Sequence, residues 1–209
     1  MPPVIPGFQK LDIYPPGPDN KGDLNAAKQS LQKCGQPNGF STNVSYRAER
    51  PKEKATAEAL QQSLGRVGIK LTLKPFPVGD YLALYAGKPS YANGNDLGLM
   101  VYGWAADWND GFGFLSQIVD GRVIRPTGGS SNLSVNIPEV NNMIDQAEAE
   151  TDANKRNQLW GAIDKRVMEE AVVLPGVWSK SVTLRGTQTT NVFVNEAFGQ
   201  YDYTTMGLQ

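Results

Sequence analysis

The residues best suited to chemistry lie close together in the stretch 103–112. It holds two tryptophans, Trp104 and Trp108, and two carboxylates, Asp107 and Asp110. Indole rings offer flat apolar surfaces that tolerate many ligand side chains, and we expect Trp108 to be the more exposed of the two. A carboxylate in a site closed to water can hold an ammonium group by a charge-assisted hydrogen bond. These residue types predict ligand capture in a loop.

Each of these side chains also has a structural interpretation, and the sequence leaves both open. Asp107 either contacts a ligand or caps the backbone amides of its own loop. Trp104 either lines a site or anchors the loop as a buried ring. Gly103 would let the backbone approach a ligand closely. Asp110 precedes Gly111, so we expect it to shape a turn.

The chain contains no histidine, which supplies most general bases near neutral pH and most transition-metal ligands. Ser-His-Asp and Cys-His catalysis within the chain are therefore excluded, and we expect no metal site and no cofactor. Asp107 and Asp110 could still form a carboxylate pair for glycoside hydrolysis, but acids this close in a loop are more typical of turns. We therefore expect no enzymatic activity. Cys34, the single cysteine, is interpreted as a small buried apolar side chain.

Charge and length restrict the partners of the chain. Its 209 residues include 20 basic and 21 acidic ones, so the positive field needed for nucleic acid or anionic lipid is absent and no nucleic-acid partner is expected. The sequence contains no apolar run of about 18 residues, so it predicts no membrane-spanning helix. The first seven residues lack the basic and apolar regions of a signal peptide, so no export signal is expected in this chain.

The elements that position the loop alternate between helix and strand, which predicts an α/β fold. The apolar run 97–102 is typical of a strand, and the loop follows it at the end where open α/β sheets place their ligands. Asp152 is expected to cap a helix and to pair with Arg156, while Trp160 is expected to pack in the core. The predicted strands are 41–47, 69–73, 97–102, 172–174, 181–184 and 191–194, and the predicted helices are 24–34, 51–67, 80–85, 112–119, 138–147 and 153–170.

Several short signatures follow one another in a fixed order over nearly the whole chain. They are Asp23 to Gly35, Leu64 to Ile69, Gly103 to Asp110, Ile137 to Val140, Thr151 to Arg156 and Val172 to Pro175. Taken together, this succession resembles the C-terminal half of the family 5 extracellular solute-binding proteins, the receptors of peptide-type ABC importers. The final stretch, 195–209, is similar to the natural end of that family.

The resemblance implies a lobe of a periplasmic-binding-protein-like fold of type II, the clamp type, with a mixed sheet flanked by helices. It further implies three parts: an extended entry or hinge segment 1–22, an α/β ligand-binding lobe 23–194, and a tail 195–209 that would return to an N-terminal lobe outside this chain. In peptide-binding relatives the acid matching Asp107 pairs with the α-ammonium group of the ligand. Gly103, Trp104 and Trp108 complete the expected ligand-binding residues.

The expected function is capture of a solute, most plainly a peptide, and its delivery to an ABC permease without any chemical change. The parent protein would lie outside the cytoplasmic membrane, on the cell surface as a lipoprotein, or in the periplasm of a Gram-negative cell. The alternatives are a protein-interaction or sensing module that docks a partner through the tryptophan-rich loop, and the carboxylate-pair glycoside hydrolase.

Overall fold

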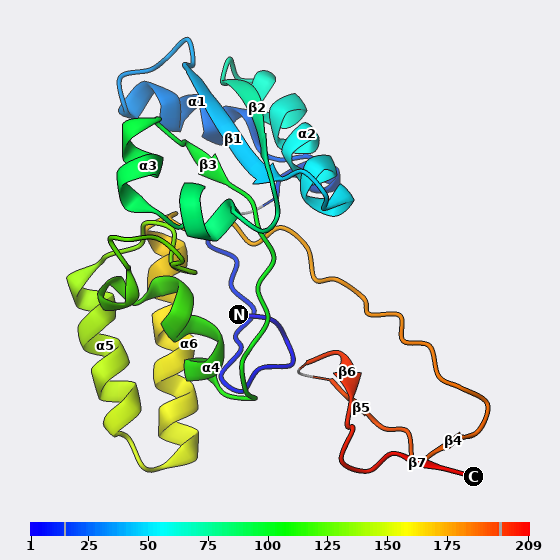
Figure 1. The fold of residues 1–209 in the computed structure, drawn as a ribbon. Helices are drawn as coiled ribbons and strands as arrows, with labels where there is room; N and C mark the ends of the chain where they lie inside the picture. Colours follow the sequence, from blue (N-terminus) through cyan, green and yellow to red (C-terminus); the bar gives the residue numbers. More distant parts are fainter. Residues whose placement is uncertain (15, 197) are drawn as a thin grey trace. The chain divides into compact units, whose positions relative to one another are not determined.

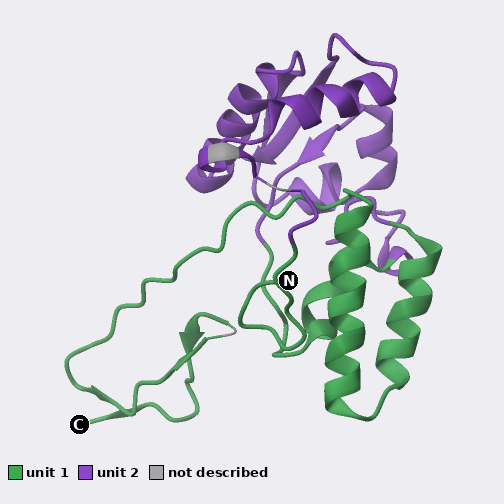
Figure 2. Ribbon diagram, turned by 180° about the vertical axis from the view of Figure 1, so that it is seen from behind, with its two compact units in different colours: residues 1–11, 104–120, 136–209 green, residues 12–103, 121–135 purple. Residues whose placement is uncertain are grey.

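The computed structural model describes residues 1–14, 16–196 and 198–209, so Pro15 in the predicted entry segment and Ala197 in the predicted tail lie outside it. The chain divides into two compact units, shown in different colours in Figure 2. One unit, the sheet unit, comprises residues 12–103 and 121–135. The other, the helical unit, comprises residues 1–11, 104–120 and 136–209.

The sheet unit contains a parallel three-stranded sheet in the order β2-β1-β3. The strands are β1 (Ser41–Arg47), β2 (Lys70–Phe76) and β3 (Leu99–Met100). Val44 lies opposite Leu73 on one side and Leu99 on the other, which fixes the register. The predicted α/β class, with a sheet flanked by helices, is confirmed. All pairs described in this sheet are parallel, and antiparallel pairs occur in two separate small sheets.

The helix α2 (Pro51–Gly65) covers one face of this sheet. Its apolar positions repeat at helical spacing, and Pro51 occupies the first turn, where its missing N–H is not needed. The buried residues of this core, with the side chains packed on them, come from both layers. They are Val44, Tyr46, Ala57 and Leu71, joined by Leu60, Leu64, Ile69, Leu73, Leu99 and Val101. Burial of this one helix face against the strands holds the sheet unit together.

Other elements of the sheet unit are short. They are η1 (Pro18–Asn20), α1 (Leu24–Lys33), a single π-helical turn η2 (Tyr81–Tyr85), α3 (Pro89–Gly94) and η3 (Gly121–Val123). Asp23 caps α1 as predicted, because its carboxylate accepts from the amides of Asn25 and Ala26. The prediction for Cys34 is wrong. It follows the last residue of α1, its thiol donates to the Leu31 carbonyl at 3.2 Å, and the residue is exposed because no described residue packs over this end of the helix closely enough to bury it.

The helical unit is built around three helices, α4 (Gly111–Val119), α5 (Pro138–Ala149) and α6 (Ala153–Glu169). Asp152 caps α6 as predicted, since its carboxylate accepts from the amide of Lys155 at 2.9 Å. Trp160 is fully buried on α6, which confirms its predicted packing role. The buried side chains shared by the three helices are Phe114, Leu115, Val119, Val140, Ile144, Ala147, Trp160, Ile163 and Val167. None of the described helices has the length and apolar character needed to cross a bilayer.

The rest of the helical unit departs from prediction after residue 170. The expected strands 172–174 and 181–184 are irregular, and Figure 1 shows this part as an extended orange trace. The strands found there pair only two residues each: β4 (Thr189–Thr190) with β7 (Gly207–Leu208), and β5 (Val194–Asn195) with β6 (Gln200–Tyr201). An apolar pattern alone therefore does not determine a strand in this segment, because a strand also needs a neighbour to pair with.

Candidate functional site

The predicted loop begins at Gly103, the last residue of the first segment of the sheet unit. Gly103 is exposed and is the third residue after the strand β3. A Cβ built on Gly103 would have only the Arg47 Nη2 atom within 4 Å, at 3.8 Å. The backbone at Gly103 is thus open, and it lies beside a guanidinium group. This is the carboxyl end of the parallel sheet, where ligands of open α/β sheets bind.

Asp107 lies in the helical unit and is exposed. Its amide donates to the Gly113 carbonyl at 3.0 Å, which fixes the loop backbone. Within residues 1–14, 16–196 and 198–209, the Asp107 carboxylate has no hydrogen bond and no ion pair. The amide of Asp110, which Asp107 was one candidate to cap, donates instead to the Trp108 carbonyl at 2.8 Å. The carboxylate of Asp107 is therefore available to an external cation.

The two tryptophans of the loop differ in their contacts. Trp108 is 48% exposed and stacks on Phe112, with ring centroids 5.5 Å apart. Trp104 is partly buried, and its indole Nε1 donates to the Phe114 carbonyl at 2.8 Å. This bond ties the start of the loop to the helix α4. An exposed indole next to an available carboxylate leaves Trp108 and Asp107 as the better-placed pair for a ligand, while their contact with one stays a prediction.

Asp110 has a structural role. Its carboxylate accepts from the Phe112 amide at 2.8 Å and so caps α4. The Arg156 Nε atom lies 3.6 Å from the same carboxylate. The predicted partner of Arg156 was Asp152, so the ion pair is corrected to Asp110. Because Asp110 is held by both contacts, the loop presents one available carboxylate instead of the two that glycoside hydrolysis requires.

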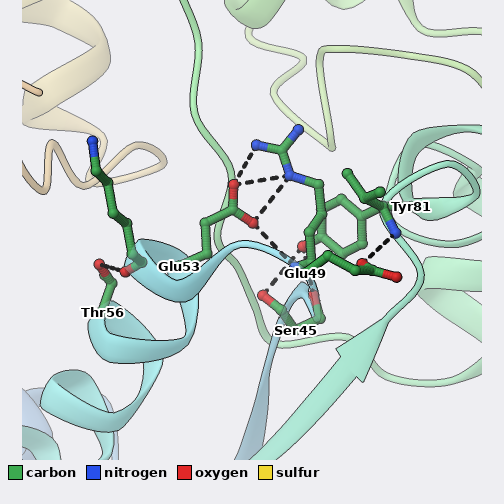
Figure 3. A network of polar contacts seen from close by, with 8 residues as sticks. Ser45, Glu49, Glu53, Thr56 and Tyr81 are labelled. Atoms are coloured by element: carbon green, nitrogen blue, oxygen red, sulfur yellow. Dashed lines mark hydrogen bonds and ion pairs between the residues drawn. The ribbon is translucent and has the colours of Figure 1, made fainter. Parts of the chain in front are cut away.

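A polar network in the sheet unit was missed by the sequence analysis. Glu53 accepts from the Arg47 Nε atom at 2.8 Å and 3.0 Å, from Arg47 Nη2, and from the Arg47 amide at 3.0 Å. Both side chains are largely buried, with 16% and 10% exposed for Arg47 and Glu53. The hydrogen bonds that Glu53 accepts raise the pKa of Arg47 above its ordinary value. Figure 3 shows Glu53 in this network with Ser45 and Tyr81.

Two tyrosines extend this network. Tyr81 is fully buried, and its hydroxyl lies 3.0 Å from Ser45 Oγ and donates to the Ser45 carbonyl at 3.2 Å. The Tyr102 hydroxyl donates to the Ser131 carbonyl, and the Arg47 guanidinium lies 6.0 Å from the centre of its ring. The available signal was positional: Arg47 ends a predicted strand, and Glu53 follows Pro51 at the third position of a helix, where a carboxylate commonly reaches back to the preceding backbone.

A second candidate site is a concavity near the amino end of β1. A concavity of about 320 Å³ is lined by Ser41, Thr42, Asn43, Thr72, Lys74 and Asp96. It lies toward the amino end of β1, whereas the ligands of open parallel sheets bind at the carboxyl ends. The carboxyl end of β1 and the loop that follows β3 are therefore the better candidates for a binding site. Among the described residues, no group of three or more Cys, Asp or Glu side chains could hold a metal ion.

Comparisons with known proteins agree on one family. The model of the bacterial extracellular solute-binding proteins, family 5 Middle, matches residues 1–124. Heme-binding protein A of Haemophilus influenzae is 26% identical over 181 residues, covering 84% of this chain and 30% of that protein. Glutathione-binding protein GsiB of Escherichia coli strain K12 is 25% identical over 191 residues, covering 91% of this chain and 36% of that protein. The chain thus spans about a third of the length of these relatives.

Solved structures similar to this chain are also binding proteins of this kind. A clavulanic acid biosynthesis oligopeptide binding protein 2 superposes with a TM-score of 0.93 at 45% identity, over 100% of this chain and 37% of that one. The periplasmic binding protein DppA from Helicobacter pylori, in complex with the peptide STSA, gives a TM-score of 0.66 at 25% identity, over 81% of this chain and 30% of that one. Because the family model covers more than half of the chain and structures of such binding proteins share its fold, the chain belongs to the bacterial extracellular solute-binding proteins of family 5.

Proposed function

We propose that this chain forms part of the receptor of an ABC importer and binds a peptide, or a similar small solute with an ammonium group, without changing it. The observation that carries the proposal is the exposed Asp107 carboxylate, which has no partner among the described residues and follows a β-strand next to an exposed indole, Trp108. A group of this kind can hold the α-ammonium of any peptide, so affinity need not depend on the ligand sequence. The names of several relatives, which bind peptides or glutathione, support the same class of ligand.

The parent protein would capture the solute by closing around it, a shift in population that the ligand favours, and would then pass it to a membrane permease. Its place would be outside the cytoplasmic membrane, as a surface lipoprotein or in the periplasm. The three-part organisation 1–22, 23–194 and 195–209 belongs to this proposal. The proposal also includes an N-terminal lobe that would contact residues 171–208. This segment carries many exposed apolar side chains.

The proposal is tested by replacing Asp107 with Asn in the 209-residue chain. Titration with alanine tripeptides, followed by amide NMR, should shift resonances of residues 103–112 in the wild type. The Asp107→Asn variant should bind about tenfold or more weakly, because the charge-assisted hydrogen bond to the ammonium is lost. N-acetylation of the peptide should weaken binding to the wild type by a similar factor and change binding to the variant little.

Glu148→Gln is the matched control, since Glu148 is exposed on α5 and its replacement removes the same charge from the same unit. It should leave the affinity unchanged. Equal affinities of acetylated and free tripeptides for the wild type would exclude Asp107 as an amine anchor. If tripeptides bind nowhere and Trp108 fluorescence is not protected from a quencher by any of them, the peptide proposal is wrong, and docking of a partner protein becomes the better explanation of the exposed indole.

A further inference from the structure

The carboxyl end of β1 holds a guanidinium group whose charge is already neutralised. Arg47 is the last residue of this strand, and its Nη2 atom lies 3.8 Å from the position that a Cβ on Gly103 would occupy. Arginine has five N–H donors, and Glu53 engages Nε–H and one N–H of Nη2. Among residues 1–14, 16–196 and 198–209, the Nη1 atom of Arg47 has no hydrogen-bond partner. Donors therefore remain for a ligand beside an open backbone.

The contacts of Glu53 fix both the position and the net charge of this group. Its carboxylate binds the Arg47 side chain through two N–H groups, an arrangement that holds a planar guanidinium in one orientation. It also accepts from the amide of Arg47 at 3.0 Å, so it is tied to the strand end itself. Since Glu53 is only 10% exposed in its side chain, water screens its charge poorly. The pair therefore presents hydrogen-bond donors with almost no net charge.

We propose that Glu53 determines ligand selectivity at this end of the sheet, because it neutralises Arg47 and so makes the pair a site for an uncharged carbonyl oxygen instead of a free carboxylate. This inference rests on the proposed binding of peptides. An unpaired arginine would attract a C-terminal carboxylate strongly. With Glu53 bound, the attraction of Arg47 for an anion is offset by the repulsion from Glu53 a few ångströms further away. A peptide carbonyl needs only the donors.

The decisive comparison uses alanine tripeptide as the free acid and as its C-terminal amide, titrated calorimetrically into the 209-residue chain. The wild type should bind the amide at least as tightly as the acid. Glu53→Gln keeps a hydrogen-bond acceptor and exposes the charge of Arg47, so the ratio of acid to amide affinity should rise roughly tenfold. Arg47→Gln leaves the charge of Glu53 uncompensated, so the same ratio should fall. The two variants thus move selectivity in opposite directions.

Glu58→Gln is the matched control, because Glu58 lies on the same helix α2, is exposed and pairs only with Lys54 among the described residues. It should leave the ratio unchanged. Thermal unfolding by circular dichroism establishes which variants are folded. Either Glu53→Gln or Arg47→Gln alone is sufficient to test the predicted change in the ratio. A wild type that prefers the acid tenfold, or folded variants with the ratio of the wild type, would overturn the inference while peptide binding stands. If the wild type binds neither peptide, the proposed function itself fails, and this inference with it.

Discussion

At the scale of single residues, the sheet unit keeps two phenol hydroxyls away from water. Burial raises the pKa of Tyr81 to about 12, more than its hydrogen bond with Ser45 lowers it. Burial likewise raises the pKa of Tyr102. Both rings lie beside the Arg47–Glu53 pair, and Tyr102 directly precedes Gly103. The Tyr81 hydroxyl thus bonds β1 at Ser45, and the Tyr102 hydroxyl ties the residue before Gly103 to the Ser131 carbonyl.

We expect the chain to lose stability between pH 10 and 12. An unfolded tyrosine loses its proton near pH 10, whereas folded Tyr81 keeps it to about pH 12, so the unfolded state is favoured as pH rises through this interval. The stabilisation is fully present below pH 10, and the loss of stability reaches about 2 kcal/mol by pH 12. Urea unfolding at several pH values, with tyrosinate absorbance as a second readout, measures it.

Tyr81→Phe provides the comparison for this pH effect. The variant should be about 1 kcal/mol less stable at pH 7, where it lacks the hydrogen bond with Ser45, and should lose less stability above pH 10. Tyr203→Phe is the control, since Tyr203 is 69% exposed and should affect neither quantity. An identical decline above pH 10 in wild type and Tyr81→Phe would show that Tyr81 does not cause it.

At the scale of elements, the parts that fold by local rules were predictable from the sequence. The strand 41–47 was predicted with the bounds of β1, and α2, α4, α5 and α6 begin within one or two residues of the predicted positions. Their caps and first-turn prolines are encoded locally, and so is their apolar spacing. The Arg47–Glu53 pair had only a positional signal in the sequence, because its contacts depend on how the end of a strand meets the start of the next helix. The strands expected at 172–174 and 181–184 are absent, and the one expected at 191–194 overlaps β5 at Val194 alone, because pairing requires a neighbour that a pattern does not reveal.

Replacing glycine with alanine should change the stability of the chain in opposite directions at two helix positions. A Cβ at Gly111, the first residue of α4, would lie 2.3 Å from the Trp160 Cγ atom. Trp160 is fully buried, and its Nε1 atom has no hydrogen-bond partner among the described residues, so packing alone holds the ring. Gly111→Ala should therefore destabilise the chain by about 1–3 kcal/mol through overpacking.

Gly65→Ala is the matched substitution, at the end of α2, where a Cβ would meet nothing within 4 Å. It should stabilise the chain by about 0.4–1 kcal/mol, because alanine restricts the unfolded chain more than glycine does. Urea denaturation of both variants gives the two free energies of unfolding. A Gly111→Ala variant at least as stable as the wild type would contradict the close approach of α4 to Trp160.

At the scale of the whole molecule, the exposed apolar side chains favour a further contact that would cover them. The segment 171–208 exposes an unusual number of large apolar side chains. They are Val172, Leu174, Val177, Trp178, Val182, Leu184, Phe193, Val194, Tyr203 and Leu208. Large apolar side chains exposed in such number on one segment are typical of a surface that another surface covers. This agrees with a chain that spans about a third of its relatives, and it supports the proposed contact with an N-terminal lobe.

The isolated chain should therefore self-associate through this segment. Val182 and Leu184 are 89% and 90% exposed, so replacing both with Lys removes apolar surface without disturbing a core. We expect Val182→Lys/Leu184→Lys to sediment as a monomer at concentrations where the wild type associates, and to bind less of a dye that reports exposed apolar surface. Its free energy of unfolding should stay within about 0.5 kcal/mol of the wild type, as for other surface substitutions. A wild type that is monomeric and does not bind the dye would show that this segment covers itself, and the argument for a partner lobe would lose its physical basis.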